Sequence, residues 1–95
     1  MKTGYVYIMA NKNRTTFYIG VTNNIKRRVA EHRGAVSSKS FTKRYNCFQL
    51  MYYETIVGMM NAIRREKQLK NWHRPWKIAL IKTINPYLRD LAEDW

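Results

Sequence analysis

The sequence predicts a small α/β or α+β sandwich, and three observations support this fold class. The predicted elements follow the order ββαβαα, with the strands paired antiparallel. Hydrophobic residues make up 45% of the 95 positions and aromatic residues 14%, which is enough for one compact core and unlike a disordered chain. No repeat, linker or shift in composition divides the sequence, so we expect residues 1–95 to form a single domain.

The chain begins with a predicted β-hairpin. Residues 5–10 (YVYIMA) and 15–21 (TTFYIGV) are rich in Tyr, Val, Ile and Phe, as strands are. The segment NKNR between them supplies turn residues. The hairpin therefore places Tyr7 on one arm and Tyr18 on the other. Both tyrosines can be explained as core packing or as parts of a site.

A helix and a loop are expected next. Thr22 or Asn23 can cap a helix that runs to about Arg33, and Gly34 can end it. Residues 34–47 are polar and basic without a clear period, which favours a loop.

The second half of the chain predicts a strand and two helices. Residues 48–55 (FQLMYYET) form the third predicted strand, and a helix follows from about Gly58 to Trp72. Pro75 occupies a first-turn position of the next helix, PWKIALIKTI. Pro86 interrupts this helix and introduces the last segment, YLRDLAEDW.

Charge is the strongest signal in the composition. A net charge of +12 creates a positive field that favours polyanions, so nucleic acid is the expected partner. A surface that serves solubility, or a ribosome-associated protein without catalysis, is the alternative. The single cysteine excludes an internal disulfide, and no stretch approaches the roughly 20 apolar residues of a membrane span. A cytoplasmic protein without a membrane partner is expected.

Two polar side chains of the first predicted helix fall where apolar ones are expected. Ile25 and Val29 define the inward stripe, and Arg28 and His32 occupy other positions of the same i, i+3, i+4, i+7 pattern. An arginine that lays its stem over the core and a histidine bonded to a backbone carbonyl would explain them structurally. The other explanation is a functional site.

Glu66 raises the same question on the second predicted helix. A glutamate is rarely buried unless it is paired or bound. An i, i+4 bridge to Lys70 contributes only a few tenths of a kcal/mol, too little to offset burial, so a site is the better explanation. The apolar stripe that Glu66 interrupts consists of Met59, Ala62, Ile63 and Leu69.

The six acidic residues limit the metal chemistry that we expect. Three lie within the last six positions, Glu31 is predicted on the outer helix face, and Glu54 is predicted at a strand end. Only Glu66 is placed inward. A two-metal centre needs several bridging acids, whereas one Mg²⁺ ion with mostly water ligands suits one carboxylate.

Five residues and two motifs together resemble a known family, the GIY-YIG nucleases. The motif Tyr18-Ile19-Gly20 reproduces the second half of the family signature, and Tyr5-Val6-Tyr7 takes the place of the first half. Tyr5 stands where the signature has its first glycine, and Gly4 comes one position early. The blocks YIGVTNNIKRRVAEH, REKQLKNW and NPYLRDL resemble the small stand-alone bacterial branch across nearly the whole chain. The five residues are Tyr7, Tyr18, Arg28, His32 and Glu66.

The resemblance implies a three-stranded antiparallel sheet flanked by helices and a metal-dependent endonuclease. It implies that Tyr7 and Tyr18 line the active face and that Arg28 contacts the scissile phosphate. His32 would join a proton relay, and Glu66 would hold one Mg²⁺ or Mn²⁺ ion. Asn85, in INPYL, is a weaker match to a polar residue that some members place near the site.

Hydrolysis of a phosphodiester requires an activated water and a charge partner for the phosphate. A tyrosine with a pKa near ~10 is a poor base unless a cation and a metal lower that pKa. Arg28 can lower it and can also hold phosphate oxygens. We expect Tyr7 to be the base or its immediate relay and Tyr18 to orient the water or the phosphate. The opposite assignment is nearly as well supported.

Cations interleaved with aromatic residues predict contacts with nucleic acid. The loop SSKSFTKRYN and the run KNWHRPWK suit phosphate contacts and base stacking, although Trp72 and Trp76 are better explained as core. DNA is the favoured partner and RNA the alternative, without an obligate protein partner. A flap, nick or branch is a better target than a defined sequence. The candidate contacts are Lys26, Arg27, Lys39, Lys43, Arg44, Lys70, Arg74 and Lys77.

Three functions are compatible with these patterns. The first is a nuclease, and the second is a non-catalytic nucleic-acid-binding module with a relic active site. The third is a protein-interaction domain, which the net charge of +12 disfavours. Because a degenerate site is expected to lose Arg28 or Glu66 first, the presence of both favours the nuclease.

Overall fold

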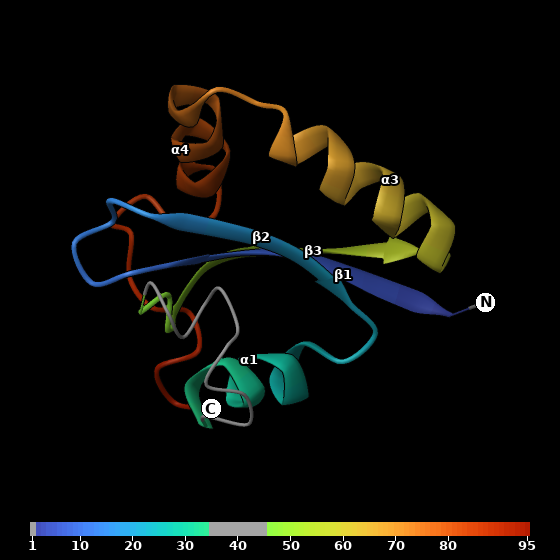
Figure 1. Ribbon diagram of the computed structural model, residues 1–95, viewed down its shortest axis with the longest axis horizontal. Helices are drawn as coiled ribbons and strands as arrows, with labels where there is room; N and C mark the ends of the chain where they lie inside the picture. Colours follow the sequence, from blue (N-terminus) through green and yellow to red (C-terminus); the bar gives the residue numbers. More distant parts are fainter. Residues whose placement is uncertain (1, 35–45) are drawn as a thin grey trace.

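The computed structural model describes residues 2–34 and 46–95, which form a three-stranded sheet with helices on both faces (Figure 1). The predicted order ββαβαα and the predicted fold class are confirmed. Most of the predicted loop, including Lys39, Lys43 and Arg44, lies outside the described residues. The elements are β1 (Thr3–Ala10), β2 (Phe17–Thr22), α1 (Ile25–Gly34), β3 (Gln49–Val57), α3 (Met59–Lys70) and α4 (Arg74–Lys82).

β1 is the central strand, and it pairs antiparallel with β2 on one side and β3 on the other. In this register Tyr7 lies between Gly20 of β2 and Tyr53 of β3. A register shift between Ile8 and Met9 interrupts the pairing with β3. β2 is an edge strand, so groups on either face of the sheet can meet at its exposed border.

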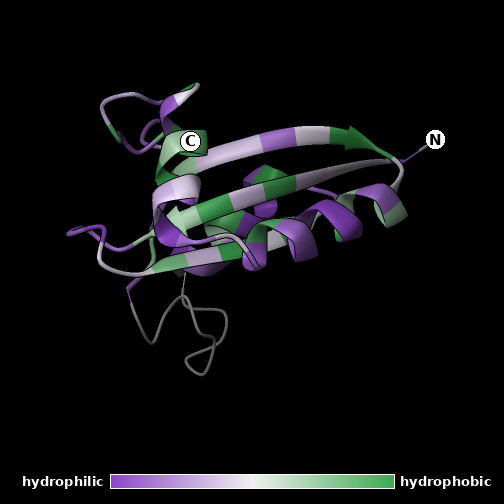
Figure 2. Cartoon of the chain, turned by 90° about the horizontal axis from the view of Figure 1, so that it is seen from above, coloured by the Kyte–Doolittle hydropathy of each residue, from purple (hydrophilic) through white to green (hydrophobic). Residues whose placement is uncertain are grey.

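Alternation along β1 divides the core into two layers, because successive side chains of a strand point to opposite faces. Val6, Ile8 and Ala10 pack with Ala62, Leu69 and Ile81 on the face covered by α3 and α4. Tyr7 and Met9 pack with Ile25 and Val29 on the face covered by α1. Figure 2 shows hydrophobic residues along the strands and mainly hydrophilic residues on the visible side of α3.

Position 4 requires a glycine because α3 packs closely against β1 there. A Cβ atom at Gly4 would lie 2.5 Å from the Cβ of Ala62 and 3.0 Å from the Sδ of Met59. The glycine that comes one position early in the signature therefore makes room for a helix on the face away from Tyr7.

Asp90 joins the C-terminal segment to the end of α1 by an ion pair and to β3 by a hydrogen bond. Arg33 Nη2 contacts Asp90 Oδ2 at 2.5 Å, and Arg33 Nε donates to the Phe48 carbonyl at 2.9 Å. Asp90 Oδ1 accepts from the backbone N–H groups of Leu50 and Ala92, both at 3.0 Å. These contacts hold α1 at a fixed position over the sheet.

Within the described ranges, no helix has the length and apolar character needed to span a membrane.

Candidate active site

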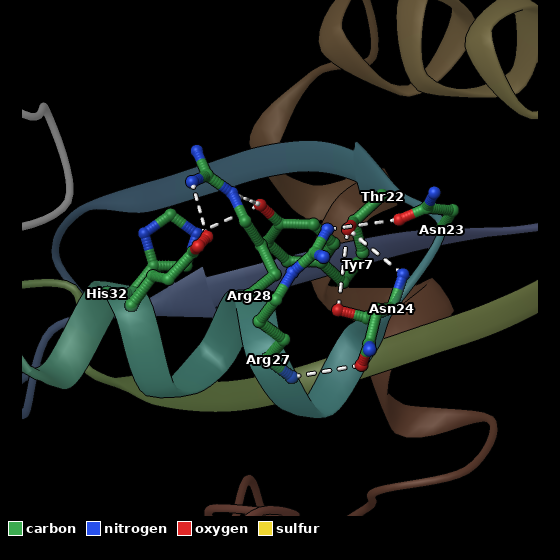
Figure 3. A network of polar contacts seen from close by, with 8 residues as sticks. Tyr7, Thr22, Asn23, Asn24, Arg27, Arg28 and His32 are labelled. Carbon is green, nitrogen blue, oxygen red and sulfur yellow. Dashed lines mark hydrogen bonds and ion pairs between the residues drawn. The ribbon is translucent and has the colours of Figure 1, made fainter. Parts of the chain in front are cut away.

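The hydroxyl of Tyr7 is the centre of a buried polar network on the α1 face (Figure 3). It lies 2.9 Å from Nε2 of His32, and Nε of Arg28 donates to it at 3.3 Å. Tyr7 is completely buried and His32 is nearly so. Arg28 and His32 are one turn apart on α1, so both side chains reach the same point on β1. With Tyr18, whose ring lies beside those of Tyr7 and His32, the structure brings together four of the five predicted site residues.

Gly20 provides the space that the Tyr7 ring occupies. A Cβ atom at Gly20 would lie 2.6 Å from Cζ of Tyr7 and 2.9 Å from Cε1 of Tyr18, and it would meet the Tyr7 hydroxyl as well. The backbone of Gly20 does not have a positive φ. The motif therefore requires glycine here for lack of space rather than for backbone conformation.

The start of α1 is fixed by Asn24, whereas the sequence predicted a cap at Thr22 or Asn23. Asn24 Oδ1 accepts from the backbone N–H of Arg27 at 3.1 Å, which satisfies a free donor of the first turn. Thr22 Oγ1 accepts from the Asn24 N–H at 3.2 Å, and Arg27 Nη2 donates to Asn23 Oδ1 at 3.2 Å. The loop between β2 and α1 is thereby ordered, and it sets the position of Arg28.

Burial determines the protonation of this network. It raises the pKa of Tyr7, although the hydrogen bond from Arg28 opposes the shift. Burial, and then the charge of Arg28, lowers the pKa of His32 to about 4, with Glu31 acting in the other direction. Burial opposes the charge of Arg28, but hydrogen bonds to Tyr7 and Glu31 outweigh it and raise its pKa. At pH 7 a neutral tyrosine hydroxyl therefore shares a hydrogen bond with a neutral histidine and accepts one from a charged arginine.

The low pKa of His32 predicts a loss of stability in mild acid. Because its pKa falls from 6.5 to about 4 on folding, the unfolded chain binds more protons between these values. The free energy of unfolding should therefore fall by about 3 kcal/mol as the pH decreases through this window. Urea unfolding at pH 7.5 and pH 4.5 measures the loss, which His32→Gln should reduce. The matched variant His73→Gln, at an exposed histidine, should keep the full loss. Equal losses in both variants would contradict the assignment.

Tyr18 extends the network toward the edge of the sheet. Its ring centroid lies 6.2 Å from that of Tyr7 and 5.4 Å from that of His32. Tyr18 also lines a cavity of about 260 Å³, together with Phe17, Ile19, Lys70 and Lys77. This edge cavity thus joins a residue next to Tyr7 with two cations from α3 and α4.

Glu66 belongs to α3, on the face of the sheet opposite α1. Its side chain is 14% exposed, and Oε2 lies 3.4 Å from Nζ of Lys70, the i, i+4 partner expected from the sequence. Lys70 in turn lines the edge cavity with Tyr18. The sheet therefore lies between Glu66 and the Tyr7 network, and only its ion-pair partner Lys70 reaches the edge cavity that Tyr18 lines.

The arrangement of the acidic side chains limits the kind of metal ion that the site could hold. No group of three or more His, Cys, Asp or Glu residues in the part of the chain that the structure describes is arranged to hold an ion. A single carboxylate fits a Mg²⁺ or Mn²⁺ ion that keeps most of its waters and gains its remaining ligands from a substrate phosphate.

The structure places Glu54 inside a strand rather than at its end, and it gives Glu31 a partner. Glu54 lies within β3, where it accepts from the Tyr52 hydroxyl at 2.5 Å and from Arg65 Nε at 2.6 Å. It ties β3 to α3. Glu31 contacts Arg28 at 3.1 Å and so belongs to the site. Its position three residues after Arg28 was the sequence signal for this contact.

Asn85 is placed away from the Tyr7 network. Its Nδ2 donates to the carbonyls of Met51 at 2.9 Å and Arg89 at 2.7 Å, and its Oδ1 accepts from the Arg89 N–H at 3.0 Å. These bonds use the buried amide to hold the C-terminal turn on β3, which explains Asn85 without a role in chemistry.

The predicted nucleic-acid contacts fall into different environments. Arg74 donates to the carbonyls of Thr15 and Arg14 and lies over the Phe17 ring, so it braces the β1–β2 turn. Lys70 and Lys77 lie at the edge cavity. Lys26 lies 5.6 Å from the ring centroid of Trp95, and Arg27 contacts Asn23. Trp72 packs against the core, whereas Trp76 is 57% exposed.

Comparison with known proteins gives the family of this fold and site. The model of the GIY-YIG catalytic domain matches residues 3–79, so the chain belongs to the GIY-YIG family. It is similar to a UPF0213 protein of Syntrophus aciditrophicus, with 33% identity over 82 residues, 86% of this chain and 93% of that one. It is also similar to a UPF0213 protein of Natronomonas pharaonis, with 32% identity over 81% of this chain and 88% of that one.

A solved structure agrees with the same assignment. The solution NMR structure of a UPF0213 protein from Bacillus halodurans superimposes with a TM-score of 0.57 at 26% sequence identity. The match covers 90% of this chain and 88% of that one. The three-stranded antiparallel sheet with its helices is therefore the fold of these small GIY-YIG proteins.

Proposed function

We propose that this protein is a metal-dependent endonuclease that hydrolyses phosphodiester bonds in nucleic acid, with DNA as the favoured substrate. The observation that carries the proposal is the contact of the Tyr7 hydroxyl with both Arg28 and His32, within a GIY-YIG catalytic domain. A charged arginine beside a neutral acid–base pair is suited to bind a phosphate and move a proton. The net charge of +12 supports a polyanionic substrate.

Proton transfer in this proposal runs through Tyr7. Since the pKa of Tyr7 is raised, its hydroxyl is not a base by itself but a relay: it takes a proton from water as it passes its own to Nε2 of His32. His32 is unprotonated at pH 7 and can accept that proton. The positive charge of Arg28 stabilises negative charge that develops on the Tyr7 oxygen.

The remaining roles are assigned by position. Arg28 contacts the scissile phosphate through the exposed end of its guanidinium, and Tyr18 orients the phosphate or the attacking water from the edge cavity. Lys70 and Lys77 contact the neighbouring backbone phosphates there. A Mg²⁺ or Mn²⁺ ion held by Glu66 would supply Lewis-acid stabilisation of the leaving oxygen.

Cleavage assays test this function directly. The purified protein is incubated with Mg²⁺ or Mn²⁺ and labelled single-stranded, duplex, flap and branched DNA, and with RNA. We expect cleavage of at least one substrate, its loss in EDTA, and its loss in Glu66→Gln. The matched variant Glu93→Gln removes an exposed acid outside the site and should cleave normally.

Two results would contradict the proposal in different ways. Normal cleavage by Glu66→Gln would remove Glu66 from the mechanism. Binding of the same substrates without cleavage, with either metal and equally in wild type and Glu66→Gln, would favour a non-catalytic nucleic-acid-binding module.

A further inference from the structure

Glu31 contacts the candidate active site from its solvent side. Its Oε1 accepts a hydrogen bond from Nη1 of Arg28 at 3.1 Å. The same guanidinium donates through Nε to the Tyr7 hydroxyl at 3.3 Å (Figure 3). A single arginine is therefore shared between the hydroxyls of Tyr7 and Tyr18 on the side of the sheet and the carboxylate of Glu31 on the other.

The contacts of Arg28 with Tyr7 and with Glu31 differ in their surroundings. Tyr7 is completely buried, whereas the side chains of Arg28 and Glu31 are 38% and 35% exposed. Exposed ion pairs at this spacing change an equilibrium by only about two- to fivefold. The contact with Glu31 is therefore too weak to position Arg28, and weak enough for another anion to replace it.

A phosphate that approaches Arg28 from solvent reaches the end of the guanidinium to which Glu31 is already hydrogen-bonded. Nε is directed at Tyr7, so the accessible donors are those at the end of the guanidinium, where Nη1 holds Glu31. Two anions at one guanidinium end repel each other. A bound phosphate is thus favoured when the carboxylate has moved away, which a glutamate near the end of α1 can do by rotating into water.

We propose that Glu31 is a displaceable counter-ion of Arg28: its carboxylate occupies the guanidinium in the free protein and gives way to a phosphate group of the substrate. That the phosphate belongs to nucleic acid rests on the proposed function. The exchange lowers the affinity for every phosphate, product ends included. Glu31 therefore acts through Arg28 and does not itself take part in bond breaking.

Phosphate binding without catalysis tests the exchange. Inorganic phosphate is titrated into wild type and Glu31→Gln in the absence of metal and nucleic acid, and the Nε–Hε resonance of Arg28 is followed by NMR. Glutamine keeps the shape but loses the charge, so Glu31→Gln should bind phosphate about two- to fivefold more tightly. Equal or weaker binding, or an Arg28 resonance that does not respond in either protein, would overturn the proposal.

Two further variants separate the exchange from general electrostatics. Glu93→Gln changes the net charge by the same amount at an exposed site and should leave the phosphate affinity near that of wild type. The gain from Glu31→Gln should disappear when Arg28 is replaced by Met. An equal gain in Glu93→Gln, or a gain that persists without Arg28, would show that only the overall field had changed.

The same variant makes a distinct prediction for cleavage. Since Glu31 opposes binding of substrate and transition state alike, Glu31→Gln should lower KM by a similar factor without raising kcat. An ion pair that only stabilised the fold would not improve KM. A protein that cleaves nothing would refute the proposed function, while the phosphate titration would still decide the role of Glu31.

Discussion

Replacement of Tyr7 by Phe is expected to reduce kcat for phosphodiester cleavage by about 10²–10⁴-fold, the usual contribution of a positioned proton-transfer group. The ring is retained, so the packing against Met9, Ile25 and Val29 is preserved. What is lost is the hydroxyl that accepts a hydrogen bond from Arg28 and shares one with His32. The proposed relay between water and the imidazole would thereby be broken.

The experiment is a comparison of three single Tyr→Phe variants in the cleavage assay. Tyr5 lies on the same strand and the same face as Tyr7, packed against Tyr53, and serves as the matched control. We expect Tyr5→Phe to cleave normally and Tyr7→Phe to fail while circular dichroism shows a folded domain. Full activity of Tyr7→Phe, with loss in Tyr18→Phe, would transfer the relay to Tyr18.

The sequence predicted that Arg28 and His32 lie on one side of α1, but it did not predict which groups surround them. The helical spacing placed Arg28 and His32 on one side, and the structure confirms that both reach Tyr7. Sequence periodicity could not show that a tyrosine hydroxyl would satisfy both of them, because this contact joins residues 21 and 25 positions apart. A snorkelling arginine and a backbone-bonded histidine were also consistent with the pattern.

The acidic residues show the limits of periodicity most clearly. Glu31 was assigned to the outer face of its helix, and it is indeed partly exposed, yet it contacts Arg28. Glu54 was assigned to a strand end, and it lies within β3 because the strand extends to Val57. In both cases the charge of a neighbour, rather than the burial of the position, determines what the carboxylate does.

Basic residues from one segment of the sequence also differ in their tertiary contacts. Arg74 belongs to a run that the sequence predicted to contact nucleic acid. Its guanidinium instead donates hydrogen bonds to carbonyls of the β1–β2 turn. Lys70 and Lys77 come from the same region and instead lie beside Tyr18. A count of cations therefore predicts the class of partner, while tertiary contacts decide which cations remain accessible to it.

Replacement of Gly20 by Ala is expected to impair both stability and catalysis. The added Cβ would overlap the Tyr7 ring and hydroxyl, which are completely buried and cannot withdraw into solvent. Overpacking of this kind costs about 1–3 kcal/mol of unfolding free energy. Because the displaced group is the hydroxyl between Arg28 and His32, a shift of about 1 Å should also lower kcat by about 10²-fold.

Gly4→Ala provides the control for this prediction, because it introduces a similar overlap on the opposite face of the sheet. There the added atom meets Ala62 and Met59 of α3, away from Tyr7. Urea unfolding should show comparable destabilisation in both variants. Cleavage measured at a temperature where both are folded should be lost in Gly20→Ala and retained in Gly4→Ala. If both variants kept wild-type kcat, the glycine of the YIG motif would serve packing alone; if only Gly20→Ala lost it, that glycine would be what allows the Tyr7 hydroxyl to reach its two partners.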